Sequence, residues 1–447
     1  MPCYSLLVGA LSLFLLLFRV PLALGASNLM ILDNPERMTF GGFASAMTTI
    51  GDIDDDGVND YLIGAYDYQV RYLSPTNLSE HQGRAFVFSG KTGKLVFTLD
   101  TPVPMPSAAF GFSVADASDV NKDGTPDFFV GAFGYEGSGK AFVFSGKDAT
   151  LLHTFQAPQR QIGAGFGWSV SALGDLNADG VSELIVGAFG QDGEGKAFVF
   201  DGDTGKLLRT LESPQPPSGS AFGWSVANAG DLDKDGVADI LVGAPYSTVG
   251  PITVQGRVYA FSGKDGKLLR TLEDPQPAAG EVFGWRVTSA GDLNKDGVPD
   301  ILVGAPYKDV GSNPSQGQAF VFNGADGKIL YILNNPAPKP YAGFGYVLVQ
   351  GPDVDEDSAS EILVGAPFQT VDQFHVQGEV FVFNGWDGRH LITFDDPYPH
   401  QGASFGYSIA SPGDVNGDKF PDFAIGASGQ GIMDKVAIGR VFVFLSR

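Results

Sequence analysis

The chain of 447 residues has a formal net charge of −23, from 51 acidic and 28 basic residues. An acidic surface argues against nucleic acid or an anionic membrane as a partner, because both attract basic surfaces. Apolar residues make up 43% of the chain, which is enough for a core, and 61 glycines with 28 prolines predict many turns between short strands.

The N-terminus differs in kind from the rest of the chain. Residues 5–24 are almost all apolar, and small residues at Ala23 and Gly25 fit a signal cleavage site. We interpret residues 1–25 as a signal peptide, with an uncleaved anchor as the alternative. The only cysteine, Cys3, lies in this segment, so the mature chain would lack disulfides. We expect an extracellular protein (periplasmic or on the cell surface in a bacterium) without membrane insertion after cleavage.

Residues 26–447 repeat one pattern seven times. Each unit has a Phe-Gly tag, an acidic nonapeptide, an apolar run ending in Gly-Ala and a run resembling AFVF. We place the tags at Phe40-Gly41, Phe110-Gly111, Phe166-Gly167, Phe222-Gly223, Phe283-Gly284, Phe344-Gly345 and Phe405-Gly406. The units cover approximately residues 37–102, 107–158, 163–214, 219–275, 280–336, 341–397 and 402–447. A fixed repeat of this length is typical of propellers and solenoids.

The first six units each predict four short strands, and helical periodicity is absent. We therefore expect an all-β fold, a seven-bladed β-propeller of four-stranded antiparallel blades in one domain, with a β-solenoid as the alternative. The seventh unit stops after its third strand, whereas residues 28–36 resemble an isolated fourth strand. This split predicts a ring closed by the N-terminal strand, which completes the last blade and removes open sheet edges.

The acidic nonapeptides lie between the first and second strands of each unit. They are residues 52–60, 119–127, 175–183, 231–239, 292–300, 353–361 and 414–422. Positions 1, 5 and 9 are always acidic, position 3 is Asp or Asn, and position 6 is Gly in five of the seven. This spacing supplies the oxygen ligands that calcium prefers, including a backbone carbonyl at position 7, while magnesium prefers more water. A plain Asp/Gly turn is the alternative for any single copy.

We expect several calcium ions, up to seven, that stabilise the fold by binding only the native state. The expected ligands, in chain order, are Asp52, Asp54, Asp56, Val58, Asp60; Asp119, Asn121, Asp123, Thr125, Asp127; Asp175, Asn177, Asp179, Val181, Glu183; Asp231, Asp233, Asp235, Val237, Asp239; Asp292, Asn294, Asp296, Val298, Asp300; Asp353, Asp355, Asp357, Ala359, Glu361; and Asp414, Asn416, Asp418, Phe420, Asp422. Ser358 and Lys419 replace glycine at position 6, so these two loops should lose the easy left-handed bend and bind most weakly.

The tags, the acidic loops and the Gly-Ala-Pro ends of the fourth to sixth units together resemble FG-GAP repeats, as in the N-terminal propeller of integrin α-chains. The resemblance covers about residues 28–447 and implies a calcium-binding propeller of the kind used in adhesion, with calcium in some blades. No leg domain, membrane helix or cytoplasmic tail follows the repeats in this sequence, so we do not expect integrin signalling to carry over.

Strand order places the acidic loops on one face and the loops between the second and third strands on the other. The second set varies in length, and variable loops on a rigid scaffold commonly bind partners. Our candidate contacts are Tyr66, Tyr68, Tyr72, Tyr246 and Tyr307, with packing between blades as the alternative. The predicted function is recognition of an extracellular protein or glycan. A secreted polysaccharide lyase or hydrolase is the alternative, but acids repeated in every unit favour metal ligation over a unique catalytic pair.

Overall fold

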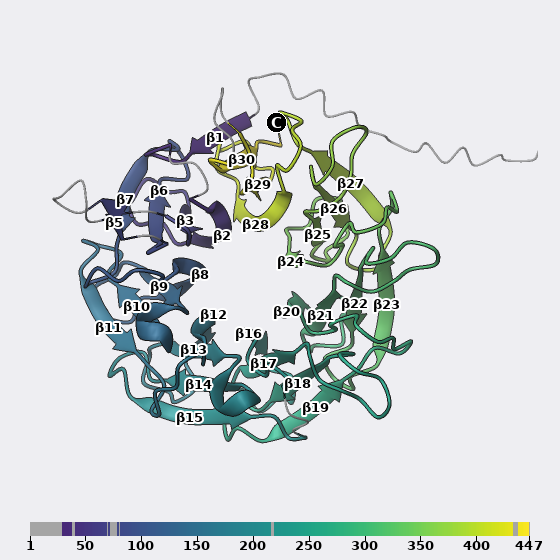
Figure 1. Ribbon diagram of the computed structural model, residues 1–447, viewed down its shortest axis with the longest axis horizontal. Coiled ribbons are helices and arrows are strands. Elements are labelled where there is room, and N and C mark those ends of the chain that lie inside the picture. The colour runs from purple at the N-terminus through teal and green to yellow at the C-terminus, as the bar shows by residue number, and fades with distance from the viewer. Residues whose placement is uncertain are drawn as a thin grey trace, which may run out of the picture.

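The computed structural model describes residues 29–37, 41–68, 70–71, 78–79, 81–215, 219–431 and 437–446. These residues form seven four-stranded antiparallel sheets arranged as blades around a central axis (Figure 1). The prediction of a seven-bladed propeller is confirmed. The proposed signal peptide lies outside the described residues. Within the part of the chain that the structure describes, we find no helix with the length and apolarity needed to cross a membrane.

Each blade runs from its innermost to its outermost strand in chain order, except the last. Blades 1 to 3 are β2 (Phe43–Ile50), β3 (Asp60–Ala65), β6 (Arg84–Phe88), β7 (Leu95–Leu99); β8 (Phe110–Ser118), β9 (Asp127–Ala132), β10 (Lys140–Phe144), β11 (Leu151–Phe155); and β12 (Phe166–Gly174), β13 (Glu183–Ala188), β14 (Lys196–Phe200), β15 (Leu207–Glu212). Blades 4 and 5 are β16 (Ser225–Gly230), β17 (Asp239–Ala244), β18 (Arg257–Phe261), β19 (Leu268–Leu272); and β20 (Arg286–Gly291), β21 (Asp300–Ala305), β22 (Gln318–Phe322), β23 (Ile329–Asn334). Blades 6 and 7 are β24 (Val347–Gln350), β25 (Ile362–Ala366), β26 (Glu379–Phe383), β27 (His390–Asp395); and β28 (Phe405–Gly413), β29 (Asp422–Ala427), β30 (Arg440–Phe444), β1 (Leu29–Asp33).

Some short elements lie outside the blades. The long loop of blade 1 contains a two-stranded sheet of β4 (Val70–Arg71) and β5 (Leu78–Ser79). The corresponding loops of blades 2 and 3 contain single 3-10 turns, η1 (Tyr135–Gly137) and η2 (Gln191–Gly193). These differences confirm that the loops between the second and third strands vary from blade to blade.

The N-terminal strand closes the ring. β1 pairs antiparallel with β30, so that Leu29 lies opposite Phe444 and Asp33 opposite Arg440. The Arg440 Nε donates a hydrogen bond to Asp33 Oδ1 at 2.7 Å. β1 is the outermost strand of blade 7, at the place where the other blades use their own fourth strand. The predicted closure is therefore confirmed.

The core lies between adjacent blades and is built largely from their second strands. Every residue of β3, β9, β13, β17, β21, β25 and β29 is buried. A strand buried on both faces reads as a continuous apolar run rather than as an alternating one. Phe129 of blade 2, for example, belongs to the same buried cluster as Phe166 and Phe198 of blade 3. The blades therefore stabilise one another through shared apolar contacts.

The Gly-Ala ends and the tags meet across the gap between blades. A Cβ atom on Gly187 would lie 2.0 Å from the carbonyl oxygen of Gly223, the tag glycine of the next blade. Gly223 itself has φ +87°, which side chains disfavour. Both glycines are required because two backbones approach closely here, and this contact explains why the two motifs recur together.

The first tag lies three residues later than predicted. Phe43 pairs with Ala65 as Phe110 pairs with Ala132, and Ala44 has the positive φ of the other tag glycines, at 65°. Phe40 lies outside the described residues. The spacing identifies Phe43 as the first tag residue, because every tag phenylalanine then precedes its acidic loop by nine residues. The Phe40-Gly41 match was a coincidence within a glycine-rich stretch.

Candidate metal-binding loops and the opposite face

The carboxylate at position 1 organises each acidic loop. In the first loop, Asp52 accepts hydrogen bonds from the backbone N–H of Asp56 at 3.1 Å and of Gly57 at 2.7 Å. The carboxylate at position 5 accepts one from position 7, as between Asp56 and Val58 at 3.0 Å. All seven loops make these three hydrogen bonds. The sequence repeat therefore corresponds to one repeated backbone turn.

The carboxylate at position 9 joins the loop to the turn between the third and fourth strands. Asp60 accepts hydrogen bonds from Ile53 N at 2.9 Å and from Gly90 N, in that turn, at 2.8 Å. The acidic loop and the turn therefore lie on the same face of the propeller, as predicted. The equivalent contact recurs in blades 2, 4, 5 and 7, where the donors are Gly146, Gly263, Gly324 and Ser446.

All seven position-9 side chains are buried, and no ion pair among the described residues includes one of them. Burial raises the pKa of Asp60 to about 6 against the effect of its two N–H donors, and neighbouring loop acids raise it further. Burial likewise raises the pKa of Asp127, Asp239 and Asp300 to about 6, and that of Glu183 and Glu361 to about 7. A buried carboxylate outside any ion pair favours binding of a proton or a metal ion. Among these acids, Asp239 has Arg270 within electrostatic range.

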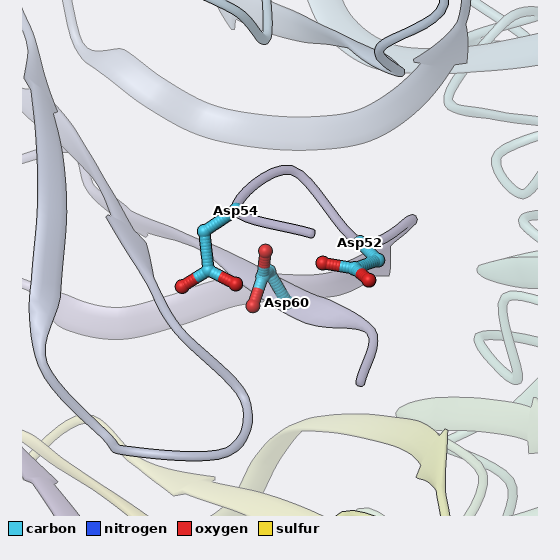
Figure 2. A group of neighbouring side chains, drawn as sticks. All are labelled: Asp52, Asp54 and Asp60. Carbon is cyan, nitrogen blue, oxygen red and sulfur yellow. The ribbon is translucent and has the colours of Figure 1, made fainter. Parts of the chain in front are cut away.

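Carboxylates converge in several loops. Asp52, Asp54 and Asp60 point toward one another (Figure 2) and bring one oxygen each within 4.8 Å of the others. The same criterion is met in three further loops, by Asp231, Asp233 and Asp239; by Asp353, Asp355 and Asp357; and by Asp179, Glu183 and Asp201. These acidic clusters could hold metal ions, since three converging oxygens supply up to half of the roughly six to eight oxygen ligands that calcium takes.

Asp201 is a member of the third cluster that the sequence interpretation missed. It lies in the turn after β14, outside the nonapeptide, and the Asn177 amide nitrogen is 3.4 Å from its Oδ2. A usable signal existed in the aligned repeats, because the residue after the third strand is Ser or Asn in five other blades. In two of these, Asn323 and Asn384 donate hydrogen bonds to the position-5 carboxylates Asp296 and Asp357.

Aromatic side chains surround the axis at the opposite face. Six of the seven residues that follow the tag glycine are aromatic, and Ser45 is the exception in blade 1. Together with Tyr66 they form a chain of ring contacts, here called the aromatic collar. Its members are Tyr66, Phe112, Trp168, Trp224, Trp285, Tyr346 and Tyr407, with successive ring centroids 5.4, 4.3, 4.5, 4.8, 5.4 and 5.2 Å apart.

Comparisons with known proteins agree with the repeat. The FG-GAP repeat family matches residues 222–261, 283–322 and 405–444, and an FG-GAP-like repeat family matches residues 119–186. FG-GAP repeats are therefore found in this chain.

Its curated relatives include integrin α-chains. Integrin alpha-5 of Xenopus laevis is 31% identical over 286 residues, which is 59% of this chain and 26% of that protein. Integrin alpha pat-2 of Caenorhabditis briggsae is 30% identical over 57% of this chain and 22% of its own length. Integrin alpha-V of Gallus gallus is 32% identical over 49% and 22%. The match therefore spans about a quarter of these relatives. The chain is an integrin alpha-like FG-GAP propeller.

The sixth and seventh FG-GAP loops keep the bend that we expected them to lose. Ser358 has φ 67° and Lys419 has φ 75°, and both donate their N–H to the position-1 carboxylate. The hydrogen bonds hold these residues in a left-handed conformation that costs about 1 kcal/mol or more without glycine. That these loops bind calcium most weakly stays a prediction.

The sixth acidic loop forms an ion pair with an arginine side chain. Arg389, in the turn between β26 and β27, pairs with Asp355 Oδ2 at 2.5 Å. At the equivalent place in blades 4 and 5, Lys267 and Lys328 pair with acids of their own turn instead. The other Asp355 oxygen, Oδ1, and Glu361 Oε2 are buried and have no hydrogen-bond partner among the described residues. Two unpartnered carboxylate oxygens fit a cation-binding site, with Arg389 as a competitor.

The candidate tyrosines have different environments. Tyr66, Tyr246 and Tyr307 are half-buried at or beside the collar, where Tyr246 contacts Trp224 and Tyr307 contacts Trp285. Tyr68 is 0% exposed and packs against Phe86, so its proposal as a contact residue was wrong. Tyr72 lies outside the described residues.

Tyr68 was misjudged because its side chain belongs to the core cluster of its blade, and position in a variable loop alone does not show exposure. The other collar aromatics were not among the candidates. The available signal was an aromatic residue directly after each of the six tag glycines.

Proposed function

We propose that this protein is an extracellular recognition or adhesion module, stabilised by calcium in its acidic loops, that binds a protein or glycan on the face opposite those loops. One observation carries the proposal: the two faces are built differently. One face repeats the same oxygen-rich turn in every blade, whereas the other combines variable loops with a collar of Trp, Tyr and Phe. Trp and Tyr are enriched at the energetic centres of protein interfaces.

Calcium is the proposed ion because the donors are carboxylates, amide oxygens and a backbone carbonyl. Positions 1, 3, 5, 7 and 9 of each loop would supply the ligands, and Asp201 would add one in blade 3. A bound ion would neutralise the buried position-9 acid and its neighbours, and would link the first two strands of a blade to the turn between the last two. These loops would therefore hold the blades together in a chain whose proposed mature form has no cysteine.

Residues 26–447 are proposed as one secreted domain, with residues 1–25 removed as a signal peptide. The names of the relatives support an extracellular adhesion role, since each is an integrin alpha chain. Activity as a polysaccharide lyase or hydrolase is the alternative. The uniform repetition of the acids supports ligation instead, because a catalytic pair would be expected in one blade only.

Two exposed aromatics make a matched test of the binding face. Tyr341, in the loop before β24, is 65% exposed on the collar face, and Trp386, in the turn before β27, is 54% exposed on the acidic-loop face. Wild type, Tyr341→Ser and Trp386→Ser are applied to arrays of extracellular matrix proteins and of glycans. We expect Tyr341→Ser to lose binding several-fold while Trp386→Ser keeps it. Loss by Trp386→Ser alone would contradict the proposed face, and turnover of a polysaccharide on the array would favour the enzyme.

A further inference from the structure

A pocket of about 300 Å³ lies on the propeller axis, inside the aromatic collar. Its wall is formed by the first strands of all seven blades, which surround the centre of the ring (Figure 1). Below the collar, this wall combines serine and threonine side chains with small or aliphatic apolar ones. A pocket of this size lies at the lower end of the range for ligand sites and is large enough for a side chain or a small molecule.

Arg286 is the one charged residue in the lining of this pocket. It follows Trp285 at the start of β20. The residues at the same place in the other blades are Ala46, Ser113, Ser169, Ser225, Val347 and Ser408. Blade 5 therefore has a long cationic side chain at a position where the other six blades have a small or aliphatic one.

The lining of the pocket holds no acidic side chain that could pair with Arg286. No hydrogen bond, ion pair or cation–π contact joins its guanidinium to any residue that the structure describes. The neighbouring serines are already engaged, since Ser225 Oγ accepts from Val287 N at 3.1 Å and Ser169 Oγ accepts from Val226 N at 3.1 Å. Arg286 is thus the one cationic donor in the lining, beside neutral hydroxyl groups such as that of Ser45.

Arg286 is enclosed by the axial channel without being buried. Its side chain is exposed to the channel, and the surrounding walls lower its pKa from the usual value. Arginine nevertheless stays protonated in proteins. A buried or channel-enclosed cation is stabilised most by a hydrogen-bonded anion, and a planar guanidinium matches a carboxylate with two parallel hydrogen bonds.

We propose that Arg286 binds a carboxylate that enters the axial pocket through the aromatic collar, and that this carboxylate belongs to an Asp or Glu side chain of a protein partner. The inference rests on the proposed function, since it names the chemistry at the centre of the same binding face. A partner docked on the collar would then insert one acidic side chain along the propeller axis.

The collar favours a protein over an acidic sugar as the source of this carboxylate. Sugar rings bind best to an open aromatic face, but the collar rings lie 4.3–5.4 Å from one another in tilted or edge contacts. Their faces are therefore occupied largely by other collar rings. A tightly packed aromatic rim around a charged centre instead resembles the apolar surroundings that exclude water from an interface hot spot.

The test uses small probes on the whole chain and needs no known partner. N-acetylglutamate methylamide presents the proposed carboxylate, and N-acetylglutamine methylamide is its neutral control. Methyl glucuronide and methyl glucoside form the corresponding sugar pair. Titrations at constant ionic strength are followed by calorimetry and by fluorescence, because Trp168, Trp224 and Trp285 are in the collar.

We expect the glutamate probe to bind at least about tenfold more tightly than the glutamine probe, and the glucuronide more weakly than the glutamate probe. Arg286→Ser, which copies the residue in blades 2, 3, 4 and 7, should abolish this preference, whereas Arg286→Lys should retain part of it. Lys147→Ser, which removes an exposed cation from the other face, controls for net charge and should leave binding unchanged.

Equal binding of the two amino-acid probes to wild type would overturn the proposal, and this arm does not depend on any variant folding. Tighter binding of the glucuronide, or an unchanged preference in Arg286→Ser, would overturn it as well. If the titrations show no preference for the glutamate probe while Tyr341→Ser still loses binding on the arrays, the proposed binding face is supported and the carboxylate site at Arg286 is not. The two failures are therefore distinguishable.

Discussion

The two faces of this propeller show what repetition and variation each do in one fold. On the acidic-loop face, seven loops make the same three hydrogen bonds, despite Ser358 and Lys419 at positions that favour glycine. On the collar face, the loops between the second and third strands differ: they contain a small sheet in blade 1 and 3-10 turns in blades 2 and 3. The difference predicts that changes to the first face alter stability and changes to the second alter binding.

Removing calcium should have the largest effect. An ion that binds only the native state adds about 2.7 kcal/mol per site at a concentration one hundred times its Kd, and several sites add together. We expect chelation to lower the Tm by ten degrees or more, on the order of several kcal/mol. Calorimetry with and without EGTA measures this, and magnesium should restore little. A Tm unmoved by chelation would remove the stabilising role of the loops.

The second-largest effect is expected when one position-9 acid is substituted. Asp239→Asn removes a ligand of the fourth loop, and we expect one fewer bound calcium and a loss of about 2 kcal/mol in calcium buffer. In chelator at pH 7 the loss should shrink or reverse, because burial disfavours the ionised Asp239. Metal analysis and denaturant unfolding report the two outcomes. Asp372→Asn, at an exposed position in the loop between β25 and β26, is the control and should change neither.

Asp396 offers a buried acid on the collar face for comparison. Burial raises its pKa to about 7, against the effects of the Tyr398 N–H and of Arg440. A carboxyl group with a raised folded pKa stabilises the protein below its unfolded pKa, near 4, and this contribution is lost as the pH rises through 7. Asp396→Asn cannot ionise, so its stability relative to wild type should increase by about 2 kcal/mol between pH 5 and 8. Urea unfolding at saturating calcium measures this, and a pH-independent difference would contradict it.

The smallest predicted effect concerns the sixth loop. Arg389 competes with a cation for Asp355, so Arg389→Gln should raise the calcium affinity of this loop several-fold, by about 1 kcal/mol. Lys328→Gln is the matched control, because Lys328 pairs with Asp326 in its own turn. Calcium titration by calorimetry distinguishes them. A lower affinity in Arg389→Gln would show that the guanidinium supports the site instead of competing with it.

Sequence reasoning was most successful where the repeat imposed one solution seven times. The blade count, the strand order and the closure by β1 could all be read from spacing, because each unit has the same apolar runs and turns. The position of the first tag could not be read from residue identity, since Ala44 takes a conformation that glycine takes elsewhere. Its spacing from Asp52 was the better guide.

Contacts that depend on three-dimensional proximity were less accessible. Asp201 joins the third cluster only because a turn folds over the loop of its blade, and Tyr68 is buried because it packs into the core of its own blade. In the sequence, Arg286 is a single arginine without a motif. Only the ring geometry shows that the first strands of all seven blades enclose one axial pocket and that Arg286 lies in it. Local sequence patterns predict local structure, whereas a site assembled from several blades can be recognised only once the fold is known.

The pairing of β1 with β30 also has a consequence for how the chain reaches its folded state. These strands are separated by more than 400 residues, and joining the ends of such a loop costs about 5 kcal/mol in chain entropy. Six blades can form from neighbouring segments, but the seventh also needs β1, which is made first and stays unpaired until β30 has been made. Until the two strands meet, each leaves an unpaired edge that could recruit another chain. Ring closure is therefore expected to be the slow, concentration-sensitive stage of folding.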